Sequence, residues 1–319
     1  MDTTTECIVS GGAGFIGSHL CDALIARNYK VYCIDNLITG SKKNIQHLVS
    51  NSRFRFILHD ISKPFAKKQS IRLRNLKFLY HLASPASPPQ YRKYSIETLL
   101  VNSFGTYYML ELAKKNKARF LVASTSEVYG DPLRHPQKET YFGNVNPVGV
   151  RSCYDEGKRF AEAITMEYVR KFGLDCRIIR VFNTYGPRMK REDGRVISNF
   201  INQAISGKPL TLYGDGSQTR SFCYISDMVA GIILAMEKEK FKGEVVNLGY
   251  PEEYTVKDIA RIILHLTNSS SVIRPCSKPE DDPAQRRPEI TKAIKSLGWQ
   301  PTITLQEGLI KTIGYFNSL

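Results

Sequence analysis

A glycine-rich turn near the start of the chain, GGAGFIG at residues 11–17, restricts the fold more than any other segment. It follows a short β-prone run, ECIVS, and it precedes SHLCDALIARN, whose apolar residues recur at helical spacing. The next run, KVYCIDN, has the composition of a second strand. This order of strand, turn, helix and strand is typical of a βαβ unit, in which a crossover helix joins two parallel strands.

The same alternation of predicted strands and helices continues along the chain. RFRFILHD, LKFLYHLAS, ARFLVASTS and CRIIRVFN have the pattern of strands, whereas SIETLLVNSFGTYYMLELAKKNK and the segment from about Ser152 to Phe172 have the pattern of helices. Strands that alternate with helices form a mostly parallel sheet with helices on both faces. We therefore expect an α/β fold built on a doubly wound parallel sheet.

Beyond this sheet, we expect a second, smaller lobe. Glycine, proline and charged residues become denser in NTYGPRMKREDGR, which favours a boundary between residues 182 and 183. Part of 220–240, within FCYISDMVAGIILAMEK, has the pattern of a strand and a helix that return to the first lobe. RPCSKPEDDPAQRRPE is too long for a simple turn, so we expect a functional surface loop there.

Charge and cysteine content exclude several classes of protein. Lys and Arg number 45 against 30 Asp and Glu, a net charge of +15 that favours anionic partners. The basic residues are spread along the chain without a block, which argues against nucleic acid. The seven cysteines are scattered without a C-x-x-C pair, so neither a disulfide framework nor a zinc site is indicated. With no apolar run long enough for a membrane span and no signal-peptide pattern, we expect a cytoplasmic protein.

The glycine turn has the spacing of a dinucleotide-binding loop. Gly11, Gly14 and Gly17 stand between the predicted strand and helix, where glycine lets the backbone turn tightly and approach a pyrophosphate at the helix N-terminus. An ordinary glycine turn would share this pattern. Asp35, however, ends the next strand, where a carboxylate accepts hydrogen bonds from a ribose and repels a 2′-phosphate. The combination favours NAD over NADP.

A candidate base lies on the long predicted helix. Tyr154 and Lys158 are four residues apart, so both side chains share one face of the helix. An ammonium beside a phenol lowers the pKa of the phenol, so we expect Tyr154 to be a base near neutral pH. STSEVYG adds hydroxyls at the C-terminal end of a predicted strand, where doubly wound folds bind ligands. A polar strand end that only caps a turn is the alternative for that segment.

Longer motifs resemble a known family. GGAGFIG, STSEVYG, SCYDEGK, FNTYGPR and YGDGSQTRSF together resemble the extended short-chain dehydrogenase/reductase family that acts on nucleotide sugars, from about residue 7 to 317. Within that family HLASPASP, the segment around SCYDEGKR, DGRVISNF and DDPAQRRPEI resemble the UDP-glucuronate decarboxylases, which are also called UDP-xylose synthases. The resemblance implies a Rossmann-type NAD-binding domain, residues 1–182, and a nucleotide-sugar-binding domain, residues 183–319. It also implies a homodimer joined through the helices before Lys117 and after Ser152.

The resemblance implies a reaction and a set of catalytic residues, namely Thr125, Glu127, Tyr154 and Lys158. Tyr154 would take the proton of the C4 hydroxyl while NAD oxidises C4. The 4-keto sugar then carries its carboxylate β to a ketone, and it loses carbon dioxide to leave an enolate stabilised by hydrogen bonds from Tyr154 and Thr125. Protonation at C5 and reduction at C4 would give UDP-xylose with NAD regenerated and no metal required.

Ser126 and Glu127 distinguish decarboxylation from related reactions on the same scaffold. Sugar 4,6-dehydratases carry Asp where this chain has Ser126, a far weaker acid, and UDP-galactose-type 4-epimerases usually lack the carboxylate of Glu127. Glu127 is expected to orient the sugar or a water that protonates C5, and the alternative is that its charge repels the substrate carboxylate. A non-catalytic NAD-sensing protein would not need Thr125, Tyr154 and Lys158 together. Tyr129 and Cys153 are interpreted as structural.

The remaining site residues are also assigned by the resemblance. The cofactor is expected to contact Gly11, Gly14, Phe15, Ile16, Gly17, Asp35, Asn36, Asp60, Ile61, Leu82, Ala83, Tyr154 and Lys158. The UDP-sugar is expected to contact Pro85, Asn183, Arg188, Tyr213, Arg220 and Arg286. Arg220 and Arg286 match positions that hold the diphosphate, for which guanidinium groups are well suited. Tyr213 is expected either at the uridine or in the core.

Overall fold

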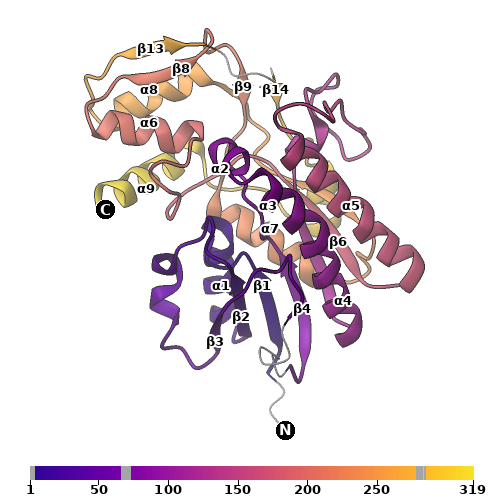
Figure 1. Ribbon diagram of the computed structural model, residues 1–319. Helices are drawn as coiled ribbons and strands as arrows, with labels where there is room; N and C mark the ends of the chain where they lie inside the picture. The colour runs from indigo at the N-terminus through magenta and orange to yellow at the C-terminus, as the bar shows by residue number, and fades with distance from the viewer. Residues whose placement is uncertain (1–3, 66–72, 278–282, 284) are drawn as a thin grey trace.

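A parallel sheet forms the centre of the molecule in the computed structural model, which describes residues 4–65, 73–277, 283 and 285–319 (Figure 1). The strand order is β11-β6-β5-β4-β1-β2-β3, and each neighbouring pair is parallel. The strands are β1 (Glu6–Ser10), β2 (Lys30–Asp35), β3 (Phe54–Leu58), β4 (Leu76–His81), β5 (Arg119–Thr125), β6 (Cys176–Val181) and β11 (Val245–Leu248). Because the order reverses at β1, the sheet is doubly wound, which confirms the predicted fold class.

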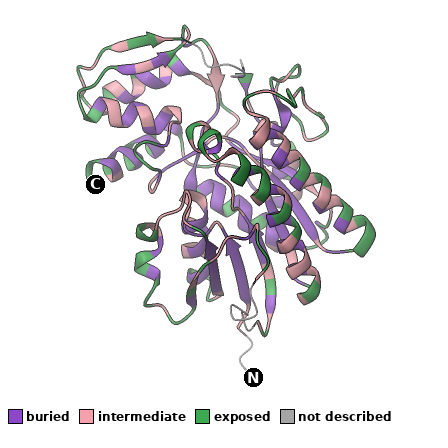
Figure 2. Ribbon diagram, viewed as in Figure 1, coloured by how far each residue is buried: buried purple, intermediate pink, exposed green. Residues whose placement is uncertain are grey.

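Helices cover both faces of this sheet. Helices α1 (Phe15–Ala26) and α7 (Ile225–Glu237) pack against each other, and α4 (Thr106–Asn116) packs beside α5 (Ser152–Phe172). Successive strand residues enter different cores: Cys7 and Val9 belong to one buried cluster and Ile8 to the other. Burial on both faces explains why the interior of β1, CIV, is a continuous apolar run rather than an alternating one, and Figure 2 shows the central strands as largely buried.

The chain between β4 and β5 is a nearly continuous helical segment. It begins with the short helices α2 (Pro88–Lys93) and α3 (Ser95–Leu100), passes through a wider π-helical turn, η3 (Val101–Gly105), and continues as α4. Helix α3 contacts α5. This segment is therefore placed between the end of β4 and the helix that carries Tyr154.

Smaller sheets and three helices form the second lobe, seen at the upper left of Figure 1. Strand β8 (Leu210–Tyr213) pairs with β13 (Ile273–Cys276), and β9 (Thr219–Arg220) pairs with both β12 (Tyr254–Thr255) and β14 (Gln285–Arg286). The helices are α6 (Val196–Ile205), α8 (Val256–Leu266) and α9 (Leu305–Asn317). The surface loop expected over RPCSKPEDDPAQRRPE is in part wrong, because β14 and all of β13 except Ile273 lie within it. Residues 278–282 and 284 lie outside the described residues.

The segment FCYISDMVAGIILAMEK contributes to both parts of the molecule. Its strand, β10 (Cys223–Tyr224), pairs with β7 (Thr184–Tyr185), whereas its helix, α7, contacts α1 and β6 of the large sheet. The following strand, β11, pairs with β6. No helix among residues 4–65, 73–277, 283 and 285–319 is long and apolar enough to cross a membrane.

Candidate active site

A cavity of about 920 Å³ lies at the C-terminal edge of the large sheet, and residues of the second lobe close it. Loops that follow β1, β2, β3, β4, β5 and β6 line it from one side, and Thr211, Tyr213, Gln218, Arg220 and Arg286 line it from the other. Every site residue predicted from the sequence lies in its wall. The cavity occupies the position where doubly wound folds bind their ligands.

The glycine turn forms one end of this cavity. Gly11 has a φ of +76°, and its amide donates to the Ile34 carbonyl at 2.8 Å, so the chain leaves β1 in a conformation that favours glycine. A Cβ at Gly17 would lie 2.1 Å from the Gly11 carbonyl oxygen, so α1 packs directly on the turn. Helix α1 has no acidic residue in its first turn. Its N-terminus is therefore free to attract an anion such as a pyrophosphate.

Asp35 stands beside the turn at the end of β2. Its Oδ2 accepts a hydrogen bond from the Ala13 amide at 3.0 Å and its Oδ1 accepts one from the Leu37 amide at 2.8 Å. Burial raises the pKa of Asp35, and these two backbone bonds partly oppose that rise. Each carboxylate oxygen keeps a second lone pair for a ligand hydroxyl. Asn36, Asp60, Ile61, Leu82 and Ala83 continue the same wall.

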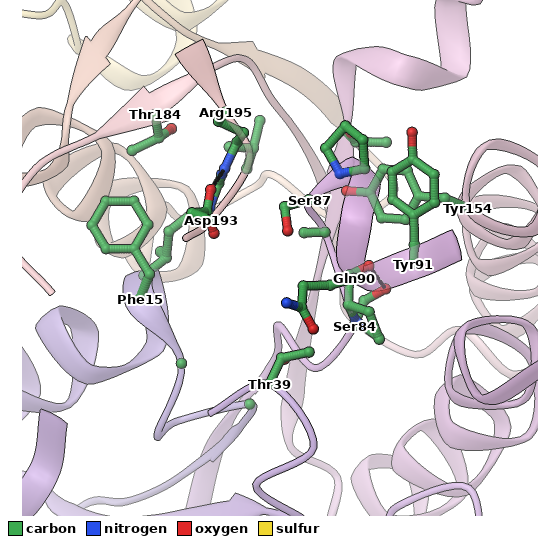
Figure 3. A pocket seen from close by; sticks show the side chains of 18 of the residues that line it. Phe15, Thr39, Ser84, Ser87, Gln90, Tyr91, Tyr154, Thr184, Asp193 and Arg195 are labelled. Atoms are coloured by element: carbon green, nitrogen blue, oxygen red, sulfur yellow. Dashed lines mark hydrogen bonds and ion pairs between the residues drawn. The ribbon is translucent and has the colours of Figure 1, made fainter. Parts of the chain in front are cut away.

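Tyr154 and Lys158 lie together on α5, as their spacing predicted, and Figure 3 shows Tyr154 beside Tyr91 in the cavity wall. The Lys158 ammonium donates to the Ala123 carbonyl at 2.8 Å and lies 5.9 Å from the centre of the Tyr154 ring. Burial raises the pKa of Tyr154 to about 12, although its hydrogen bond with Thr125 opposes the rise. Burial also lowers the pKa of Lys158 to about 7. Burial therefore outweighs any effect of Lys158 on the pKa of Tyr154, and the role of Tyr154 as a base stays a prediction.

The strand end STSEVYG both turns a corner and faces the cavity. Thr125 is the N-cap of the short helical turn η4 (Ser126–Tyr129), and its Oγ1 accepts a hydrogen bond from the Glu127 amide at 3.2 Å. Tyr129 is fully buried, and its hydroxyl donates to Asn247 Oδ1 at 2.8 Å. This contact agrees with a structural role for Tyr129, whereas Thr125, Ser126 and Glu127 line the cavity.

Glu127 lies between two guanidinium groups. It forms ion pairs with Arg151 and with Arg286, the latter at 3.3 Å. Burial raises the pKa of Glu127, but the charges of Arg286, Arg151 and Arg220 outweigh burial, so the pKa lies below its usual value and Glu127 is a carboxylate. Burial, followed by the charge of Glu127, raises the pKa of the neighbouring Asp155 to about 7.

The arginines predicted to hold the diphosphate have different environments. Arg286 is almost completely buried and donates to the carbonyls of Ser126 and Gly130, so its guanidinium braces the strand end as well as lining the cavity. Arg220 donates to the Thr219 and Pro283 carbonyls, each at 2.8 Å. Arg188 pairs with Asp22 at 2.7 Å. Tyr213 is 43% exposed on β8, so it lines the cavity rather than the core.

Three cavity residues were missed by the sequence interpretation. Tyr91 stacks on Tyr154 with ring centres 5.1 Å apart and an interplanar angle of 5°. Arg151 pairs with Glu127, and the positive charge of Arg195 partly opposes the rise that burial causes in the pKa of Tyr154. Figure 3 places Arg195 across the cavity, beside Asp193. The only available signal was their position next to motifs already identified, in PASPPQY, RSCYDEGK and DGRVISNF.

This fold and this arrangement of a glycine turn, a Tyr/Lys pair and a strand-end threonine define an extended short-chain dehydrogenase/reductase. The family model described as GDP-mannose 4,6 dehydratase matches residues 8–312, and the chain therefore belongs to that family. This confirms the class of enzyme predicted from the motifs.

Individual relatives are similar over nearly the whole chain. UDP-glucuronic acid decarboxylase 1 of Arabidopsis thaliana is 50% identical over 311 residues, which are 98% of this chain and 69% of the relative. UDP-glucuronic acid decarboxylase 1 of Xenopus tropicalis is 48% identical over 309 residues, which are 97% of this chain and 71% of the relative. Across the matched decarboxylases, this chain spans between 66% and 86% of the relative's length.

A solved structure of a related enzyme has the same fold. UDP-glucuronic acid 4-epimerase from Bacillus cereus, in complex with UDP-glucuronic acid and NAD, superposes with a TM-score of 0.89 at 33% identity, covering 98% of this chain and 99% of the epimerase. The dTDP-glucose 4,6-dehydratase of Bacillus anthracis, in complex with NAD, has a TM-score of 0.87 at 25% identity, covering 99% of this chain and 97% of the dehydratase. The scaffold is therefore shared by enzymes named for different reactions.

Proposed function

We propose that this chain decarboxylates UDP-glucuronate to UDP-xylose through a 4-keto sugar, with NAD as a bound cofactor. The observation that carries the proposal is the identity of about 50% with UDP-glucuronic acid decarboxylases over nearly the whole chain, against 25–33% for the two solved enzymes with other names. Ser126 and Glu127 at the end of β5 support the same reaction, because the strand end lacks the acid that water elimination needs.

The cavity wall fits a dinucleotide. The glycine turn and the N-terminus of α1 would hold the pyrophosphate, and Asp35 would accept hydrogen bonds from a ribose. A Cβ at Gly11 would lie 2.7 Å from the backbone of Ala83, so the turn can approach the end of β4 this closely only with glycine at position 11. NAD, when bound, supplies the reversible oxidation of the sugar at C4.

The residues of the chain would handle the protons and the developing charge. Tyr154 would accept the proton of the C4 hydroxyl in its phenolate form. Because burial raises the pKa of Tyr154 to about 12, the phenol must first lose its own proton. Thr125, already bonded to Tyr154, would donate to the enolate oxygen formed when carbon dioxide leaves. Ionised Glu127 would orient the sugar or a water near C5 rather than donate the proton itself.

We propose that the second lobe holds the nucleotide. Arg220, Arg188 and Asn183 would contact the diphosphate, and Tyr213 would contact the uridine. Pro85 would border the sugar. The contacts of Arg286 with Glu127 and Ser126 favour a position nearer the sugar than the diphosphate. The division into residues 1–182 and 183–319, with part of 220–240 returning to the first domain, remains part of this proposal, as does a cytoplasmic location supported by seven free cysteines.

Product mass tests the reaction directly. Purified protein incubated with UDP-glucuronate and NAD is expected to release carbon dioxide and to form a UDP-pentose. A product of unchanged mass would mean 4-epimerisation and would contradict the proposal. If UDP-glucuronate were unchanged but a UDP-hexose lost water, the protein would be a 4,6-dehydratase.

We also propose a homodimer formed through α3, α4 and α5. Exposed apolar side chains lie along these helices and the turn η3 that joins α3 to α4: Ile96 on α3 is 63% exposed and Phe104 on η3 is 53% exposed, and Figure 2 shows exposed surface there. Contiguous apolar patches of this kind mark protein interfaces. On two copies related by a twofold axis, the same helices would form a four-helix bundle.

Charge introduced into this surface should separate the copies. Phe104→Glu is expected to convert a dimer into a monomer at micromolar concentration, because the interface would bury an unpaired carboxylate. Phe142→Glu is the matched control, since Phe142 is 87% exposed on the loop after Tyr141 and lies outside these helices. Sedimentation velocity measures both. A monomeric native protein, or a dimer that persists in Phe104→Glu, would refute this interface.

A further inference from the structure

Glu162 lies one helical turn beyond Lys158 on α5 and is held by two neighbouring strands. Its Oε1 accepts a hydrogen bond from the Ser124 hydroxyl at 2.5 Å. Arg180 donates to the same carboxylate twice, from Nε at 2.9 Å and from Nη2 at 2.7 Å. Ser124 and Arg180 are directly opposite each other on β5 and β6. Glu162 therefore ties α5 to a paired position of the sheet.

The contact continues a series along the helix. Tyr154 is hydrogen-bonded to Thr125, Lys158 donates to the Ala123 carbonyl, and Glu162 accepts from Ser124. Three residues spaced four apart on one face of α5 therefore each contact a different one of the last three residues of β5. The position of the candidate base relative to the strand-end hydroxyl depends on this series.

Glu162 and Lys158 are four residues apart on α5, and the negative charge of Glu162 raises the pKa of Lys158 against the larger effect of burial. Among the described residues, Tyr154 and Glu162 from α5 and His81 from β4 interact with Lys158, and Arg180 from β6 pairs with Glu162. Burial, followed by the charge of Lys158, lowers the pKa of His81 to about 3, so His81 is neutral. Glu162 is the anion that opposes the loss of charge on buried Lys158.

We propose that Glu162 is a positioning residue of the reaction: it anchors α5 on the end of β5 and keeps the Lys158 ammonium charged in its buried position. The consequence for turnover rests on the proposed function, whereas the charge of Lys158 does not. The guanidinium of Arg180 also binds the Tyr129 hydroxyl at 2.9 Å and the Glu139 carbonyl at 3.1 Å, and its positive charge competes with Lys158 for the Glu162 carboxylate.

Titration of Lys158 in the free protein tests the proposal without substrate. Protein labelled with ¹³C at lysine Cε gives a Lys158 resonance that Lys158→Met identifies by its loss. In Glu162→Gln the midpoint of this titration is expected to fall by about one pH unit, because the ammonium loses its counter-charge while the side chain keeps its shape. Glu156→Gln is the control: Glu156 lies on the same helix and pairs with Arg159 at 3.4 Å, so the Lys158 midpoint should not change.

Two further variants separate charge from packing. Ser124→Ala removes the hydroxyl that binds Glu162 but no charge, so the Lys158 midpoint should stay that of the native protein. Arg180→Gln removes the cation that competes for Glu162, so the midpoint should rise. General loosening of the site would not make the Lys158 midpoint fall in Glu162→Gln and rise in Arg180→Gln. An unchanged midpoint in Glu162→Gln, or a fall in Arg180→Gln, would overturn the proposal.

The pH dependence of turnover gives the functional counterpart. The ammonium is present below the pKa of Lys158, so a lowered pKa moves the alkaline limb of the kcat profile to lower pH by the same amount. For Glu162→Gln, kcat at pH 8 is expected to fall about tenfold with KM changed less than about twofold. If the native protein failed to decarboxylate UDP-glucuronate, the proposed function would fail while the Lys158 titration still decided the role of Glu162.

Discussion

Replacing Tyr154 with Phe is expected to reduce kcat by about a thousandfold or more, because the variant has no group to accept the proton of the C4 hydroxyl. The phenol is almost completely buried in the cavity wall and bonded to Thr125. No other phenol described in the structure both lines the cavity and shares a helix face with Lys158. Single-turnover measurement with UDP-glucuronate and bound NAD would follow the loss.

The same variant should keep its fold and its cofactor. The phenyl ring introduced by Tyr154→Phe would preserve the stack on Tyr91, whose ring is nearly parallel at 5.1 Å, and Thr125 would keep its bond from the Glu127 amide. We expect the free energy of unfolding to change by about 1 kcal/mol or less and NAD affinity by less than about threefold. Tyr91→Phe is the matched control, since it removes a hydroxyl from the other ring of the stack. Native turnover in Tyr154→Phe would remove Tyr154 from the mechanism.

Much of the fold could be predicted from the sequence because the strands are buried on both faces. The interior of β1, CIV, is apolar throughout, and the elements that begin at Glu6 and Ser152 have the bounds that the sequence suggested. Short edge elements were missed. Strands β13 and β14 pair with β8 and β9, which are distant in sequence, and no local pattern in that proline-rich segment indicates such pairing.

The candidate site was predicted in its members but not in its electrostatics. Spacing along α5 brings Tyr154 and Lys158 to one face, which is a local property of a helix. Their pKa values depend on burial in the tertiary structure, which the spacing along one helix does not predict. Burial raises the pKa of Tyr154 and lowers the pKa of Lys158. The charge of a neighbouring ammonium alone would instead lower the pKa of the phenol.

Arginine roles were the hardest to predict, because a single arginine in a sequence is usually a solvated surface residue. Arg286 matched a position expected at the diphosphate, yet its guanidinium binds the strand end and Glu127. Arg151 gave no signal of its own and lies against the same carboxylate. Only the tertiary structure brings these two cations to one anion.

The second large effect is expected at Gly17, where alanine should both destabilise the protein and abolish useful NAD binding. A Cβ there would lie 2.1 Å from the Gly11 carbonyl oxygen and 2.8 Å from Gly12 Cα, which are backbone atoms that cannot rotate away. Either α1 or the turn must shift, and the first-turn amides would no longer face the pyrophosphate. We expect a loss of about 2–3 kcal/mol in the free energy of unfolding and about a hundredfold weaker NAD binding.

Alanine substitutions at two other glycines are the controls for Gly17→Ala. A Cβ added to Gly314 on α9 would have no atom within 4 Å, so Gly314→Ala should leave NAD binding unchanged and stabilise the helix by about 0.5–1 kcal/mol. A Cβ at Gly14 would meet only the Gly11 oxygen, at 3.1 Å, so Gly14→Ala should have an intermediate effect. Thermal unfolding with and without NAD, together with calorimetric titration, measures all three. If affinity for NAD were the same in Gly17→Ala and Gly314→Ala, the close approach of α1 to the turn would have no part in cofactor binding. A loss of NAD affinity that increases from Gly314→Ala through Gly14→Ala to Gly17→Ala follows only if the turn itself holds the dinucleotide.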